Sequence, residues 1–128
     1  MNQPTQQVVV SGISRCPNII YLACPYTDPS LEVRERRFLA ATEAAAKLIQ
    51  KGYIVFSPVT MTHPIDRTLA VGESTLGTEF WVSFDKAFME VCSEMAILRV
   101  EGWDRSAGIL REREFFESKG RRVWYLDP

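Results

Sequence analysis

The 128-residue chain carries a formal net charge of −1, and 46% of its residues are hydrophobic and 24% charged. This length fits one domain, and the composition is that of a globular protein with an apolar core, which excludes a disordered chain. The small net charge argues against a nucleic-acid partner, and no apolar stretch is long enough to span a membrane. We therefore expect a single domain over residues 1–128, in which 1–17 is a candidate N-terminal arm and 8–10 is either a short strand or part of that arm.

Cysteine and histidine usage narrows the class of protein further. The three cysteines, Cys16, Cys24 and Cys92, are odd in number and widely spaced, so we expect free thiols in a reducing compartment. His63 is the only histidine, so the chain lacks the ligand clusters of a zinc site, and we expect neither a metal nor another cofactor. Residues 1–7 are polar and lack the apolar run of a signal peptide. These features predict a cytoplasmic protein without a membrane partner.

The first half of the chain alternates apolar runs with helical patterns. Residues 18–23 predict a buried strand, and Asp28 is the expected N-cap of a helix that continues to about Gln50. Residues 53–56 predict a second strand. Residues 57–78 show no clear periodicity and predict a loop, either a functional lid or a partly disordered or short-helical excursion.

The second half repeats the strand and helix alternation. Residues 79–91 predict an aromatic-rich helix and 95–100 a third strand. Ser106 is the expected cap of a third helix that ends near Ser118, and 123–126 predict the last strand. The whole order predicts an α/β fold of the flavodoxin-like (Rossmann-type) class, a three-layer sandwich with a four- or five-stranded, mostly parallel sheet. In such folds the ligand binds beyond the carboxyl ends of the strands.

Two acidic residues fall on the apolar faces of these helices. Glu112 lies three residues after Ile109 and four before Phe116, so it shares their inward face. Asp85 lies four residues after Trp81 on the preceding helix and is expected among core aromatics. An unpaired buried acid is costly or becomes protonated, and one such acid is most often a structural ion pair. Two on successive helices favour a carboxylate pair of the kind that cleaves glycosidic bonds.

The loops at the expected ligand edge add weaker signals. Gly108 allows close approach of the backbone, and the helix start after Ser106 offers free N–H groups to a phosphate or a sugar hydroxyl. Tyr26 follows the first strand and would either stack on a base or fill the pocket wall. The chain has no Gly-rich dinucleotide fingerprint and no P-loop, which argues against binding of NAD and ATP.

An ordered set of motifs resembles the nucleoside 2-deoxyribosyltransferase superfamily, which includes nucleotide N-glycosidases. The set begins with YLACPY at 21–26 and continues with VFSPV at 55–59. Asp85 follows, and the set ends with GWDRSAGILRE at 102–112, which matches the family's catalytic glutamate helix. The resemblance covers about residues 19–127 and implies a homodimer or homotetramer that acts on a small-molecule nucleoside or nucleotide.

By this resemblance, the function is cleavage or transfer of the N-glycosidic bond of a nucleoside or nucleoside 5′-monophosphate, with hydrolysis and base transfer both open. Glu112 would be the nucleophile that attacks the anomeric carbon, and Asp85 would position the sugar or help to protonate the leaving base. The residues that the resemblance places against the substrate are Tyr21, Pro25, Tyr26, Asp104, Ser106 and Gly108.

Two alternatives stay open at this point. In the first, the chain is a non-catalytic nucleotide-binding or sensing module, because Cys24 stands where the family often has Gly and Glu114 where it has a small residue. Such a module would pair Glu112 with an arginine, such as Arg111 or a neighbour's Arg113, and close it to ligand. In the second, the chain is a structural or partner-binding protein without a concave polar pocket.

Overall fold

The computed structural model describes residues 17–128, so the candidate arm strand at 8–10 lies outside the described residues. Four strands form one sheet, every neighbouring pair is parallel, and the spatial order is β2-β1-β3-β4. The strands are β1 (Ile19–Ala23), β2 (Ile54–Phe56), β3 (Glu94–Leu98) and β4 (Arg122–Leu126).

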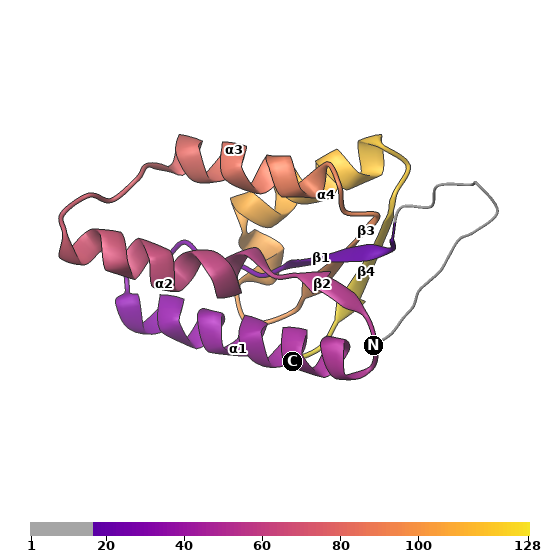
Figure 1. Ribbon diagram of the computed structural model, residues 1–128, viewed down its shortest axis with the longest axis horizontal. Helices are drawn as coiled ribbons and strands as arrows, with labels where there is room; N and C mark the ends of the chain where they lie inside the picture. The colour runs from indigo at the N-terminus through magenta and orange to yellow at the C-terminus, as the bar shows by residue number, and fades with distance from the viewer. Residues whose placement is uncertain (1–16) are drawn as a thin grey trace.

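Four α-helices cover the two faces of this sheet, as Figure 1 shows. The helices α1 (Leu31–Gln50) and α2 (Pro58–Val71) lie on one face, and α3 (Thr78–Met89) and α4 (Ala107–Ser118) lie on the other. This arrangement confirms the flavodoxin-like three-layer fold. None of the helices within residues 17–128 has the length and apolarity needed to cross a membrane.

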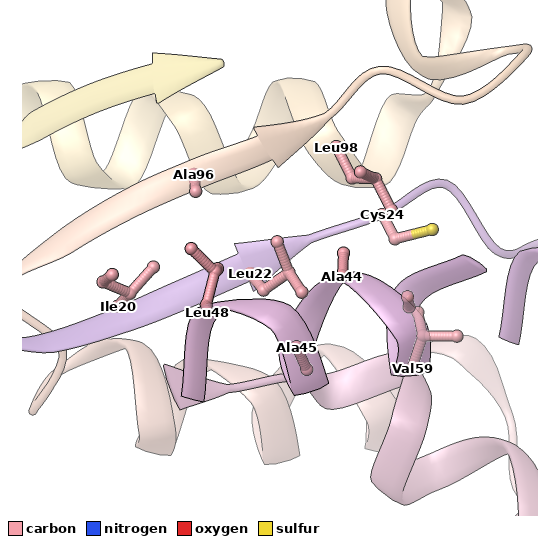
Figure 2. Packing of buried hydrophobic residues seen from close by; sticks show 10 residues of the cluster. Ile20, Leu22, Cys24, Ala44, Ala45, Leu48, Val59, Ala96 and Leu98 are labelled. Atoms are coloured by element: carbon pink, nitrogen blue, oxygen red, sulfur yellow. The ribbon is translucent and has the colours of Figure 1, made fainter. Parts of the chain in front are cut away.

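The central strand β1 supplies side chains to both halves of the core. Ile20 and Leu22 point to the α1 side, where they pack with small and aliphatic residues of that helix (Figure 2). Tyr21 and Ala23 point to the α3 and α4 side, where Phe116 is also fully buried. A strand that is buried on both faces is typical of a parallel sheet between two helical layers.

The chain reverses its winding direction between β1 and β3. These neighbouring strands pair in register, but β1 leads into α1 on one face and β3 leads through a short 3₁₀ turn into α4 on the other face. The two loops therefore diverge at the carboxyl edge of the sheet, and such a switch point leaves a crevice for a ligand.

Hydrogen bonds at the helix starts confirm one predicted cap and correct another. Ser106 caps α4, since its Oγ accepts the Ile109 N–H at 3.1 Å. The predicted cap at Asp28 is wrong, because Ser30 caps α1 and its Oγ accepts the Val33 N–H at 3.3 Å. Asp28 instead accepts the Ser30 N–H with Oδ1 at 2.9 Å, so its side chain stabilises the turn that precedes the helix.

Of the alternatives expected for 57–78, the helical one is nearest to the structure and the loop is wrong, because α2 occupies most of this segment. This helix packs on α1, with the Thr60 and Thr42 hydroxyls 3.0 Å apart and the His63 ring centroid 4.7 Å from that of Phe38. Its buried residues include a proline and a histidine, so the apolar spacing of a helix is weak in the sequence. The other predicted elements are present, with ends shifted by no more than two residues.

Pro64 lies inside α2 on its exposed side and has no N–H to donate to the preceding turn. We expect Pro64→Ala to restore this hydrogen bond and to raise the free energy of unfolding by about 1 kcal/mol, after allowance for the looser unfolded chain. Denaturant unfolding of the variant and of the wild type measures the change. Pro29→Ala is the matched control, because Pro29 is exposed in a loop and no gain is expected there. A loss of stability in Pro64→Ala would contradict the prediction.

Candidate active site

A cavity of about 820 Å³ lies at the carboxyl edge of the sheet. Its walls come from the loops that follow β1 and β3, from the first turns of α1 and α4, and from α2 and α3. Among the site residues predicted from the sequence, those that line it are Pro25, Tyr26, Asp85, Ser106, Gly108 and Glu112. The fold therefore brings both predicted acids to one cavity of the size of ligand pockets.

Glu112 projects from the second turn of α4 and is fixed by a hydrogen bond from the sheet. The hydroxyl of Tyr21 donates to Glu112 Oε2 at 2.7 Å, and Tyr21 is fully buried in β1. Burial raises the pKa of Glu112 to about 8; the Tyr21 hydrogen bond and Arg111 oppose this rise and Asp85 adds to it. The pKa of Tyr21 is itself raised, first by burial and then by the charge of Glu112. Glu112 is thus a fixed carboxyl group whose ionisation is sensitive to what enters the cavity.

Asp85 lies on α3 and reaches the same cavity. Its Oδ1 is buried and accepts no hydrogen bond from any residue in the part of the chain that the structure describes. Burial raises the pKa of Asp85 to about 6, and Arg111 opposes that rise. A buried carboxylate oxygen without a partner in a cavity wall is available to a donor on a ligand.

Tyr26 lines the cavity, and its hydroxyl contacts a histidine that lies outside the cavity wall. Its hydroxyl lies 2.6 Å from His63 Nδ1, which ties the loop after β1 to α2. His63 is buried, and burial lowers its pKa. His63 is not among the site residues that the sequence predicts, because the segment that carries it shows no helical periodicity.

Arg37 ties the two cavity loops to each other. Its Nη1 donates to the Thr27 carbonyl and its Nη2 to the Glu101 carbonyl, both at 3.2 Å. Gly102 makes room for this guanidinium, since a Cβ there would lie 2.6 Å from Arg37 Nη2, and its φ of +96° also favours glycine. No pattern in the sequence indicates this contact between residues that are far apart along the chain.

The structure does not support the expected role of three other predicted site residues in full. Tyr21 contacts Glu112 and does not line the cavity, so its part in the site is to hold the acid. Asp104 is exposed, lies 3.6 Å from Arg105 Nη1 and does not line the cavity. A Cβ at Gly108 would meet its nearest atoms at 3.7 Å, an ordinary contact, so the protein itself does not require glycine there.

The described residues hold no group of three or more His, Cys, Asp or Glu side chains that could bind a metal ion. The polar side chains of the cavity walls are carboxyl groups, arginines, a tyrosine, serine and threonine hydroxyls and the Cys24 thiol.

Residues 18–127 match the family described as "Domain of unknown function (DUF1937)", so the chain belongs to this family. No curated protein matches the chain.

The raised pKa of Glu112 predicts a pH-dependent cost in stability. Between about 4.5, the ordinary value, and about 8, the folded state holds the proton more tightly than the unfolded chain. The free energy of unfolding of the wild type should therefore fall as the pH rises through this range. Glu112→Gln cannot ionise at this position. We therefore expect the melting temperature of Glu112→Gln, relative to that of the wild type, to rise with pH up to about 8 and then to level off.

Thermal unfolding at several pH values measures this difference. Glu114→Gln is the matched control, because Glu114 is exposed two residues further along α4 and its substitution should give a pH-independent offset. Parallel curves for the wild type and Glu112→Gln would contradict the prediction.

Proposed function

We propose that this member of the DUF1937 family cleaves or transfers the N-glycosidic bond of a nucleoside or nucleoside 5′-monophosphate, with Glu112 as the nucleophile. One observation supports this most directly: Glu112, held by Tyr21, and Asp85, with an unpartnered oxygen, line the same cavity at the carboxyl edge. Two carboxyl groups in unlike surroundings suit a reaction that needs one to attack and one to handle a proton or hold the sugar.

In the proposed reaction, a Glu112 oxygen attacks the anomeric carbon while the bond from that carbon to the base nitrogen breaks. The base leaves with the bonding electron pair and takes up a proton from water. Asp85, which is ionised above a pH of about 6, is proposed to hold the sugar by accepting a hydrogen bond from one of its hydroxyls. The products are a glycosyl ester on Glu112 and the free base. Water or a second base then attacks the anomeric carbon, gives up a proton to solvent and releases the Glu112 carboxylate. Hydrolysis and transfer differ only in this last attacking group.

Tyr21 has a positioning role in this proposal. Its hydrogen bond stabilises the ionised form of Glu112 and occupies Oε2, which leaves Oε1 as the attacking oxygen. The positive charge that develops on the sugar ring would stabilise the carboxylate further. Direct contact of Tyr21 with the substrate, which the resemblance implies, is not needed for this role.

The rival function is a non-catalytic nucleotide-binding module, and it predicts that an arginine closes off Glu112. Arg111 forms no ion pair with Glu112 within the described chain, and Arg113 pairs with Glu117 at 3.1 Å. The open position of Glu112 therefore favours catalysis. The cytoplasmic location and the homodimer or homotetramer expected from the sequence stay part of this proposal.

Base release from a substrate panel tests the proposal. The wild type is incubated with deoxy- and ribonucleosides and their 5′-monophosphates, with and without an acceptor base, and free base is measured by chromatography. We expect release from at least one substrate, and a loss of at least about a thousandfold in Glu112→Ala because the covalent route is removed. Glu114→Gln should keep the wild-type rate. Equal rates in the wild type and Glu112→Ala, or no release from any member, would contradict the proposal.

The pH profile of the same reaction tests the role of Glu112. A nucleophile must be ionised in the free enzyme, so kcat/KM should rise with pH and level off above about 8. Tyr21→Phe removes a hydrogen bond that lowers the pKa of Glu112, so this limb should move to higher pH. A profile that instead falls as the pH passes 8 would make Glu112 the proton donor and overturn its role as nucleophile.

A further inference from the structure

Two arginines of α1 line the cavity without a carboxylate partner. Arg34 and Arg37 lie three residues apart, so their side chains share one face of the helix. Within residues 17–128, neither lies within 4 Å of a carboxylate oxygen. The described arginines that do have such a partner are Arg36, Arg99, Arg105, Arg113 and Arg122. Two like charges one turn apart repel, and this repulsion is uncompensated here.

Backbone carbonyls hold both side chains of this arginine pair in place. Arg34 Nη1 donates to the Asp28 carbonyl, and Arg37 donates to the Thr27 and Glu101 carbonyls. Carbonyl acceptors fix the orientation of a guanidinium but leave its charge unneutralised. Each group has five N–H donors, so both keep donors for a further acceptor. The pair is thus a pre-oriented cationic site, which lowers the entropic cost of binding an anion.

The acidic residues that line this part of the cavity form no ion pair with the two arginines. Asp28 Oδ1 accepts the Ser30 N–H, and Glu101 pairs with Arg105 at 3.1 Å. Asp66 lines the cavity from α2 and forms no ion pair with any described residue. An anion that enters the cavity would therefore meet two guanidinium groups that have no carboxylate of the described residues at ion-pair distance.

We propose that Arg34 and Arg37 form a subsite for a phosphate group of the ligand, so that the cavity takes a phosphorylated nucleoside in preference to the neutral one. Arginine is suited to this because its planar fork binds phosphate oxygens in pairs. The subsite is formed by α1 and by the loops that follow β1 and β3, and it does not use the N-terminus of α4. The anion site itself does not depend on the proposed reaction; only the nucleoside that carries the phosphate rests on the proposed function.

The test is calorimetric titration of Glu112→Gln, which binds without turnover, with deoxynucleosides, their 5′-monophosphates and their 5′-diphosphates. We expect at least about tenfold tighter binding of a phosphorylated form than of the nucleoside, weakening as salt is added. Comparison of mono- with diphosphate shows which phosphate the pair holds. In the Glu112→Gln background, the further substitution Arg34→Ala should abolish the preference for the phosphorylated form. The further substitution Arg36→Ala should preserve it, because Arg36 is an exposed arginine of the same helix.

Inorganic pyrophosphate is titrated in parallel, because it needs neither a base nor a sugar. Binding of pyrophosphate that is lost in Arg34→Ala and kept in Arg36→Ala supports the anion site even if no nucleoside is cleaved. Equal affinities for neutral and phosphorylated forms, or a phosphate preference that survives Arg34→Ala, would overturn the inference. Circular dichroism of each variant establishes that it is folded.

Discussion

The hydrogen bond from the Tyr21 hydroxyl to Glu112 joins two positions that are 91 residues apart. It requires β1 to lie at the centre of the sheet with its odd-numbered side chains toward α4, and it requires α4 to start at the carboxyl edge. Both conditions follow from the parallel order in which β1 and β3 are neighbours and lead to opposite faces. The cavity is the space that this divergence leaves, and Glu112 lies at its wall because the hydrogen bond holds it there.

The site holds charged and polar groups in positions that are unfavourable for folding, while the rest of the core is apolar. Two acids lose solvation, so their pKa values rise, and one of their oxygens has no described partner. Every residue of β3 is buried, and β1 is fully buried from Ile20 to Ala23. This apolar core stabilises the fold enough to hold acids and arginines in positions that do not favour folding, as is common at functional sites.

Sequence periodicity predicted those features that depend on a single helix or strand. The strand and helix order and the inward faces of Glu112 and Asp85 follow from spacing alone. The sequence could not reveal contacts between distant elements, such as Tyr21 with Glu112 or Arg37 with the backbone beside Gly102. The helix α2 was missed for the same reason, since tertiary packing against α1 stabilises it more than its own pattern does.

The Arg37 contacts connect the order of the loops to the binding of a ligand. This side chain holds the loop after β1 to the loop after β3, and the same guanidinium belongs to the arginine pair that faces the cavity. An anion bound to the pair would neutralise the repulsion between Arg34 and Arg37 and so strengthen the tether between the loops. The loop after β3 leads directly into the cap of α4, so tightening it would also fix the helix that carries Glu112. In the proposed enzyme, binding of the phosphate would in this way help to order the reacting group.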